Sequence, residues 1–212
     1  MAVNDRIPQT ERGGKPAIRA VFFDIGNVLL RFDVRKVVRA LAAECGCSSW
    51  RIAAMVWKVA DEVERGRMPA EEVFRRLQGI GFRSGWPRFR RIWCDQFRLE
   101  RAVAAMLTRI ASERKVYLLS NTHALHYEWI MQRYAFPRRV HGAILSHEVR
   151  RRKPEPGIYR AALRLAGVRP AESVFIDDMK ANVAAARALG MNAIRFRGAP
   201  ELRREFQALG VL

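Results

Sequence analysis

An acidic residue ends the first apolar run of this 212-residue sequence. Residues 20–23 are apolar, Asp24 follows them, and Gly26-Asn27 predicts a turn before the chain becomes apolar again. A carboxylate at the end of a buried strand is costly unless it is paired, bound to a metal or used in chemistry. Asp24 is therefore the first candidate catalytic residue.

Polar side chains also follow three predicted strands later in the chain. They are Ser120-Asn121-Thr122 after residues 116–119, Lys153 beyond residues 142–145, and Asp177-Asp178 after residues 173–176. Ligands of open parallel sheets bind at the carboxyl ends of the strands, so these side chains and Asp24 are expected to share one site. Clustered acids repel each other and raise their pKa values, whereas Mg²⁺ is held by one or two carboxylates and leaves positions for phosphate oxygens. The pattern predicts a Mg²⁺ site of this kind.

Each of these residues also has a simpler interpretation. Ser120 could be the N-cap of the helix after it, and Asp177-Asp178 could cap a helix that starts near residue 179. Lys153 could be one more solvated base in the basic run 150–153. Only their convergence with Asp24 favours catalysis.

The elements that must position these residues predict an α/β fold. After residue 100, helical patterns near 100–112, 124–134, 155–166 and 180–189 alternate with strand patterns at 116–119, 142–145, 173–176 and 193–196. This alternation is typical of a parallel, Rossmann-like sheet with helices on both faces. The chain from Asp33 to about Phe97 is helical in pattern, with breaks at Gly46, Gly66, Gly81 and Gly85, which predicts an inserted all-α cap.

The predicted domain organisation follows from these patterns. Residues 1–16 are polar and are expected to be a flexible tail. Residues 17–30 and 101–212 form the α/β core, and residues 31–100 form the helical cap. Asp33 is predicted to cap the first helix of the cap. The core of the cap is expected to contain Trp50, Trp57, Trp86 and Trp93.

Four short motifs give the sequence a family resemblance. FDIGNVL, LSNT, RRKPEP and FIDDMKAN, in this order and spacing, resemble the four motifs of the haloacid dehalogenase (HAD) superfamily of phosphohydrolases. With Glu64-Arg65-Gly66 in the cap, they most resemble bacterial phosphatases that act on glucose 1-phosphate, and more distantly the phosphatase domain of soluble epoxide hydrolase. The resemblance implies hydrolysis of a small phosphorylated metabolite, such as a hexose 1-phosphate, with Mg²⁺ as cofactor.

The resemblance also implies catalytic roles. Asp24 would attack phosphorus and form an aspartyl-phosphate. Ser120 would hydrogen-bond a phosphate oxygen, and Lys153 would neutralise charge on Asp24 and on the transferred group. The metal ligands would be Asp24, the backbone carbonyl of Gly26, Asp178 and, directly or through water, Asp177. The candidate substrate-binding residues are Asn121, Thr122, His123, Glu64 and Arg65.

Gly26 departs from the pattern of most HAD phosphatases. These enzymes carry a second Asp at this position, which protonates the leaving oxygen and then activates water, whereas the glucose 1-phosphate enzymes share the D-x-G-N-V form. General acid–base catalysis is typically worth about 10²–10⁴-fold, so the difference matters. Three explanations stay open: a leaving group that needs little protonation, such as an anomeric hydroxyl or an acyl phosphate; a proton from water, His123 or a cap residue; or loss of turnover.

Other function classes remain alternatives. A metal-independent 2-haloacid dehalogenase could use the same fold, but its chemistry does not need the acidic pair Asp177-Asp178. A catalytically weakened protein that only binds a phosphorylated ligand, or one associated with nucleic acid, is the other alternative.

Composition limits the partners. The net charge of +18 comes mostly from arginines spread over the whole sequence, without the basic stripe or module of a nucleic-acid-binding protein. We expect attraction of anionic metabolites, not a nucleic-acid partner. No apolar segment reaches the roughly 18 residues of a membrane span, and the N-terminus has no signal-peptide pattern. Three cysteines without a common metal spacing favour reduced thiols, so a cytoplasmic location is expected. No pattern predicts an oligomeric state.

Overall fold

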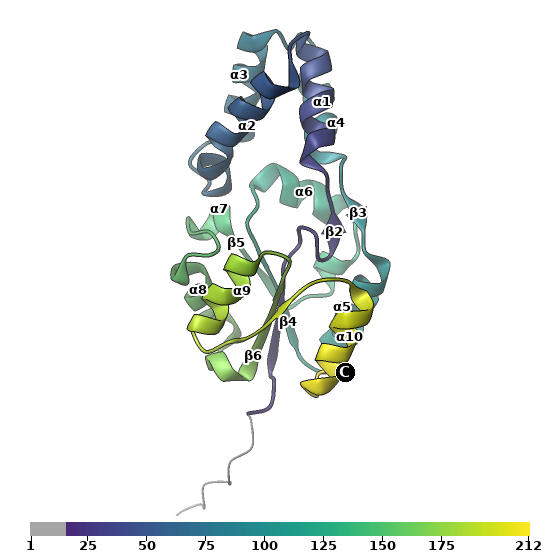
Figure 1. Cartoon of the computed structure of the whole chain (residues 1–212), viewed down its shortest axis with the longest axis vertical. Helices are drawn as coiled ribbons and strands as arrows, with labels where there is room; N and C mark the ends of the chain where they lie inside the picture. The colour runs from purple at the N-terminus through teal and green to yellow at the C-terminus, as the bar shows by residue number, and fades with distance from the viewer. Residues whose placement is uncertain (1–15) are drawn as a thin grey trace, which may run out of the picture.

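A five-stranded parallel sheet forms the centre of the computed structural model, which describes residues 16–212 (Figure 1). The predicted tail lies outside the described residues except for Pro16. The strand order is β5-β4-β1-β6-β7. The strands are β1 (Ala20–Phe23), β4 (Lys115–Ser120), β5 (Gly142–Leu145), β6 (Ser173–Asp177) and β7 (Asn192–Arg195). The predicted α/β fold is confirmed.

Helices cover both faces of this sheet. Side chains of β1 alternate, so that Val21 and Phe23 pack on one face and Ala20 and Phe22 on the other. The first face is covered by α5 (Arg101–Ala111), α6 (Ala124–Arg133) and α10 (Ala199–Ala208). The second is covered by α8 (Pro156–Ala166) and α9 (Lys180–Ala188). Short helical turns complete the core: η1 (Phe136–Arg138), α7 (Ser146–Val149) and η2 (Pro170–Glu172).

The sheet brings the candidate residues to one edge. β1 is the central strand, with β4 on one side of it and β6 on the other. The chain moves outward from β1 to β4 and β5, and then returns to place β6 on the opposite side, so the end of β1 is a topological switch point. Ligands of open α/β sheets bind at such points. Asp24, Ser120 and Asp177 leave the sheet there side by side.

Four helices form a separate layer above this edge, which we call the helical layer (Figure 1). They are α1 (Val34–Cys45), α2 (Ser49–Glu64), α3 (Ala70–Ile80) and α4 (Trp86–Cys94). Their buried side chains form a hydrophobic cluster of their own. The helical pattern predicted from the sequence is confirmed, and the carboxylate of Asp33 caps α1 by accepting a hydrogen bond of 3.0 Å from the backbone N–H of Arg35.

A two-stranded antiparallel ribbon connects the helical layer to the core. β2 (Leu30–Arg31) leads into the layer and β3 (Arg98–Leu99) leads out of it. No sequence pattern predicted this ribbon, because strands of two residues are too short to show an alternation. Among the described residues, no helix is long and apolar enough to cross a membrane.

The prediction for the tryptophans was only half right. Trp93 is buried and Trp86 packs on the core of the helical layer, but Trp50 and Trp57 are 74% and 77% exposed. α2 has apolar residues on two sides. Ile52, Val59 and Val63 face the interior, whereas Trp50 and Trp57 are seven residues apart and therefore share the opposite side of the helix.

This arrangement predicts contrasting stability effects within one helix. Ile52→Ala should lower the free energy of unfolding by about 2–5 kcal/mol, because it leaves a cavity in the core of the helical layer. Trp57→Ala should change it by less than about 0.5 kcal/mol, because the indole packs on little. Urea denaturation measures both values, and a Trp57→Ala loss as large as that of Ile52→Ala would contradict the exposed position.

Candidate active site

A buried lysine connects two of the candidate aspartates. The Lys153 ammonium nitrogen lies 2.8 Å from Asp24 Oδ1 and 2.7 Å from Asp177 Oδ2, and it donates a third hydrogen bond of 2.9 Å to the carbonyl of Leu119. Burial disfavours the charge of this ammonium, but the two carboxylates outweigh burial and raise the pKa of Lys153. Lys153 is therefore a charged partner in the site and not a solvated surface base.

Asp24 is short of positive charge in this environment. Its Oδ1 also accepts a 2.7 Å hydrogen bond from the backbone N–H of Ile25. Burial raises the pKa of Asp24 to about 7; Lys153 and the Ser120 hydroxyl oppose this shift, while the charge of Asp177 adds to it. One lysine does not balance the clustered acids, so a further cation fits the electrostatics of the site.

The carboxylate of Asp177 is fully occupied by protein groups. Its oxygens accept hydrogen bonds from Lys153 Nζ, from the backbone N–H of Met179 at 2.8 Å, and from Asn182 Nδ2 at 3.0 Å to each oxygen. A carboxylate offers about four lone-pair positions, and these four contacts use them. Asp177 is thus suited to hold Lys153 in place, and only Asp178 of the pair is left to face outward.

Asp178 and Asp24 are the carboxylates that could hold a metal ion. Oxygens of Asp24, Asp177 and Asp178 all lie within 4.8 Å of one another. Asp178 is partly exposed, and its Oδ2 accepts a 3.1 Å hydrogen bond from Asn27 Nδ2. Hard oxygen ligands at this spacing suit Mg²⁺. Gly26, whose backbone carbonyl is the remaining predicted ligand, lies between Asp24 and Asn27 in the same turn.

The LSNT motif fixes the other side of the site. Ser120 ends β4, is buried and is not a helix cap, because the N-cap of α6 is His123. The Asn121 carboxamide pairs with the backbone of Lys153: its Oδ1 accepts a 2.8 Å hydrogen bond and its Nδ2 donates one of 3.0 Å. The backbone N–H of Thr122 donates to Ser146 Oγ at 2.9 Å. The Ser120 hydroxyl lies close enough to Asp24 to oppose the rise in its pKa, whereas Asn121 and Thr122 hold the surrounding loops.

His123 lies at a junction between the core and the helical layer. Its Nε2 accepts a 3.0 Å hydrogen bond from the indole N–H of Trp93 in α4, and its ring lies 3.9 Å from that of His126. Burial, helped by His126 and His147, lowers the pKa of His123 well below its usual value, and burial lowers the pKa of His126 to about 4. Both rings are neutral near pH 7, which argues against His123 as the proton donor that replaces an acid at Gly26.

A second junction involves Glu64 and Arg65 at the end of α2. Five charged side chains, which we call the polar clasp, join this helix to the loop before α8. Their ion pairs are Arg65 with Asp61 (2.8 Å) and Glu155, and Arg152 with Asp61 (2.9 Å) and Glu64 (2.7 Å). Burial raises the pKa of Glu64, while Arg152 and Lys153 oppose the shift, so Glu64 lies within electrostatic reach of the site. Arg65 instead is engaged on both sides by acids of the clasp.

The backbone approaches closely beside the polar clasp. Gly66 has a φ of 67°, and a Cβ at this position would lie 2.5 Å from the carbonyl oxygen of His147 in the core. Ser146 Oγ also donates a 2.6 Å hydrogen bond to the carbonyl of Glu64. The Glu64-Arg65-Gly66 segment is thus a contact between the helical layer and the core.

Several contributors to the site were missed by the sequence analysis. Asn27 orients Asp178, with a φ of 52° that asparagine tolerates better than most residues, so the Gly26-Asn27 turn was a usable signal. Phe32 was not considered: a Cβ on Gly26 would lie 3.0 Å from its Cε1 atom. The Phe32 ring therefore occupies the space next to position 26, where most HAD phosphatases carry the acid. No local sequence pattern predicted which charged residues pair in the polar clasp.

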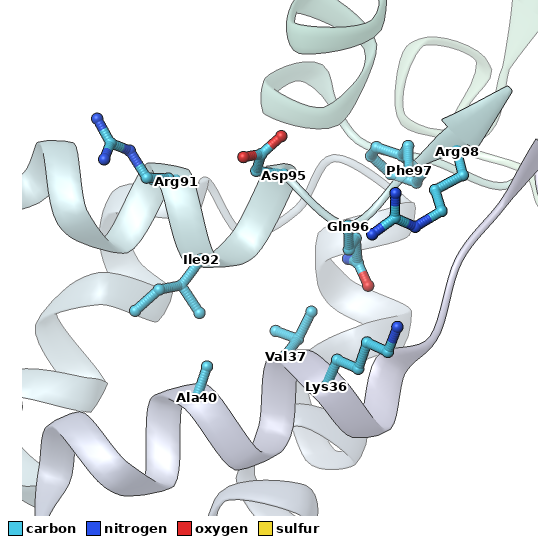
Figure 2. A pocket seen from close by; sticks show the side chains of 9 residues that line it. All are labelled: Lys36, Val37, Ala40, Arg91, Ile92, Asp95, Gln96, Phe97 and Arg98. Atoms are coloured by element: carbon cyan, nitrogen blue, oxygen red, sulfur yellow. The ribbon is translucent and has the colours of Figure 1, made fainter.

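Figure 2 shows a different cavity, of about 430 Å³, between α1 and α4. The side chains of Lys36, Gln96 and Arg98 lie at one end of it and Arg91 lies at the other. None of the candidate site residues lines this cavity. It is separate from the site around Asp24.

Comparison with known families agrees with this geometry. The family described as haloacid dehalogenase-like hydrolase matches residues 18–190. The chain belongs to this family. The superfamily resemblance of the four motifs is confirmed, and with it the expectation of a HAD hydrolase.

Curated relatives of this HAD chain include several phosphatases. The D-ribitol-5-phosphate phosphatase of Bacteroides thetaiotaomicron is 23% identical over 208 residues, which cover 91% of this chain and 98% of that protein. The sesquiterpene phosphatase astK of Aspergillus oryzae is 24% identical over 192 residues, covering 82% of this chain and 87% of that protein. Flavin mononucleotide hydrolase 1 of Arabidopsis thaliana is 36% identical, but over only 61 residues, which cover 29% of this chain and 25% of that protein.

Solved structures share the fold. A HAD family enzyme of Bacteroides thetaiotaomicron superposes with a TM-score of 0.81 at 22% identity, covering 90% of this chain and 98% of that one. Its complex with magnesium and inorganic phosphate gives a TM-score of 0.77 at 22% identity, with 86% and 96% covered. An L-2-haloacid dehalogenase also matches, with a TM-score of 0.67 at 18% identity and 91% and 100% covered. These likenesses establish the fold. The reaction has to be argued from the residues of the site.

The polar clasp predicts energetic coupling between the helical layer and the core. In a double-mutant cycle, Arg65→Met and Glu155→Gln should be non-additive by about 1 kcal/mol in the free energy of unfolding, because each removes the partner of the other. The control cycle is Arg197→Met with Glu201→Gln, an ion pair whose side chains are 63% and 35% exposed, which should couple by about 0.5 kcal/mol or less. Additive effects at the clasp would free Arg65 for substrate binding.

Proposed function

We propose that this protein is a Mg²⁺-dependent phosphatase that hydrolyses a phosphate monoester through an aspartyl-phosphate on Asp24. The observation that carries the proposal is the buried Lys153, held between Asp24 and Asp177 at the end of the central strand, with Asp178 facing the same point. The phosphatases among the relatives, and the HAD structure with magnesium and phosphate, support the same reaction.

The contacts of Asp24 support its role as the nucleophile. Lys153 and the backbone N–H of Ile25 both contact Oδ1 of Asp24 and hold the carboxylate in position for attack on phosphorus. A bond forms between the Asp24 carboxylate and phosphorus as the P–O bond to the leaving group breaks, and the leaving oxygen takes the electron pair and then a proton from water. Water then attacks phosphorus, releases phosphate and restores the Asp24 carboxylate. Lys153 and Ser120 stabilise the negative charge of the transferred group from fixed positions.

The residues present fit a magnesium ion. Asp24, Asp178 and the backbone carbonyl of Gly26 would hold it, with Asp177 acting through Lys153 and Asn182. Bound Mg²⁺ supplies positive charge that offsets the charge of the phosphate group and of the two carboxylates. Asn27 orients Asp178 for this role.

The helical layer is proposed as a cap over the site, comprising residues 31–100, with residues 17–30 and 101–212 as the HAD core. Two junctions hold it there: the polar clasp, and the hydrogen bond from Trp93 to His123. Glu64 is the layer's best candidate for a substrate contact, because it lies within electrostatic reach of Lys153. Arg65, Asn121, Thr122 and His123 act on substrate through the loops they hold.

The proposed reaction predicts a strict dependence on Mg²⁺ and Asp24. Hydrolysis of a phosphoester panel should require Mg²⁺, stop in EDTA, and fall by at least about 10³-fold in Asp24→Asn, which removes the nucleophile at constant size. Asp95→Asn, an exposed carboxylate of the helical layer, is the matched control and should keep full activity. Halide release from a 2-haloacid in EDTA would establish a dehalogenase instead.

The glycine at position 26 predicts a strong dependence on the leaving group. Without an acid, the leaving oxygen carries more negative charge in the transition state, so kcat/KM should fall steeply as leaving-group pKa rises across phosphates of similar size. This parameter reports steps up to the first irreversible one, so slow hydrolysis of the aspartyl-phosphate does not mask the trend. A flat dependence would reveal another proton donor.

Two substitutions at Gly26 distinguish the effect of an added acid from the effect of displacing the Phe32 ring. The φ of Gly26 is not in the left-handed region, so a side chain is allowed there once the Phe32 ring moves aside. Gly26→Asp should flatten the dependence and raise kcat/KM for the poorest leaving groups by up to about 10²-fold. Gly26→Ala displaces Phe32 equally but supplies no acid, and it should leave the slope unchanged.

A further inference from the structure

Exposed apolar side chains gather on one part of the described molecule. The large hydrophobic residues with exposed side chains are Phe32 (40%), Val34 (42%), Trp50 (74%), Trp57 (77%), Leu165 (56%) and Met179 (56%). Phe32 lies against Gly26, and Met179 directly follows Asp178. The other three of the helical layer line one groove. Leu165 lies elsewhere, on α8, so the clustered exposed residues are the three that line the groove.

The groove runs between α1 and α2 and has a volume of about 390 Å³. This volume is in the range of pockets that hold small organic molecules. Its polar lining residues are Arg35, Arg39 and Ser49. The rest of its wall is apolar and consists of Val34, Val38, Trp50, Ala53, Val56 and Trp57.

Phe32 lies in the chain between the Asp24 site and the residues that line the groove. The Phe32 ring borders Gly26, two residues after Asp24, and its other side meets the edge of Phe97 at 6.2 Å between ring centroids. Val34 follows Phe32 by two residues, so their Cα atoms are at most about 7 Å apart. In Figure 1, β2 rises from the carboxyl edge of the sheet directly into α1, beside α2. Phe32 therefore borders the site and Val34 lines the groove, so one short apolar segment of the chain connects the two.

We propose that the substrate is an amphiphilic phosphate monoester, which places its phosphate at Asp24 and an extended apolar or aromatic leaving group along Phe32 into the groove between α1 and α2. This inference rests on the proposed phosphatase function and names its substrate class. An apolar ligand that covers exposed indole rings removes a large apolar area from water, and this burial favours binding. The proposal also accounts for the Phe32 ring beside Gly26. Where an acid would protonate the leaving group, this chain has an apolar ring that contacts it.

A second copy of this chain is a poorer occupant of the groove. Each copy would bring Arg35 and Arg39 to the interface, and the net charge of +18 adds repulsion between copies. The leaving group of a substrate carries no such charge, and the phosphate at its other end is attracted by the basic protein.

A homologous series tests the proposal at nearly constant leaving-group pKa. For n-alkyl phosphates from ethyl to octyl, kcat/KM should rise about three- to fourfold per methylene until the groove is filled, which corresponds to burial of each CH₂. Octyl phosphate should exceed sugar phosphates of similar leaving-group pKa. In Trp57→Ala and Trp50→Ala, the octyl-to-ethyl ratio of kcat/KM should fall at least tenfold. Leu165→Ala removes an exposed leucine far from the groove and should keep the wild-type ratio.

The outcomes separate this inference from the proposed function. A kcat/KM that is flat along the series, or tryptophan variants with the wild-type ratio, would overturn the amphiphilic substrate while Mg²⁺-dependent hydrolysis still stood. If no phosphoester is turned over, the proposed function fails, and binding of octyl phosphate to the wild-type chain then decides the groove. An affinity for alkyl phosphates that rises with the length of the alkyl group and is lost in Trp57→Ala supports the groove as their binding site. A Trp57-dependent dimer in size-exclusion chromatography, or an acidic peptide whose binding depends on Trp57 and is not competed by octyl phosphate, would overturn the amphiphilic substrate and assign the groove to a protein partner.

Discussion

A single buried ammonium sets the constraints for the rest of this molecule. Lys153 is almost completely excluded from solvent and must be compensated by Asp24, Asp177 and a carbonyl of β4. Removing one partner of such a buried pair typically costs about 3–5 kcal/mol, since the other charge is left unpaired. The same contacts that stabilise the fold therefore aim Asp24 and occupy Asp177. Asn121 and Asn182 complete the arrangement by fixing the backbone of Lys153 and the carboxylate of Asp177.

The helical layer depends on the same loops. Arg152 of the polar clasp is the neighbour of Lys153 in the chain, and Ser146, which follows β5, contacts both Thr122 and Glu64. The core side chains that contact the helical layer thus lie on loops that follow the catalytic strands. The layer is therefore attached to the loops around Asp24 and not only to the surface of the core.

The strand ends were the part of this molecule that the sequence predicted well. Asp24, Ser120 and Asp177 each end an apolar run, and parallel sheets bring such ends together, so local pattern and topology were sufficient. The side chains of Trp50 and Trp57 were assigned to the interior because apolar residues usually pack, and one helix can carry apolar residues on two sides. The polar clasp and the contact of Phe32 with Gly26 join segments that no sequence period relates. They depend on how the helical layer sits on the sheet, which local pattern does not encode.

The β2–β3 ribbon makes the helical layer an exchangeable part. Leu30 pairs with Leu99 and Arg31 pairs with Arg98, so the chain leaves the core and returns to it at adjacent positions. An insertion between two neighbouring points does not disturb the sheet, whatever its length or fold. Recombination at this ribbon could graft a different module onto the same catalytic strands. The ribbon thus confines the connection between the helical layer and the catalytic strands to one short, paired crossing.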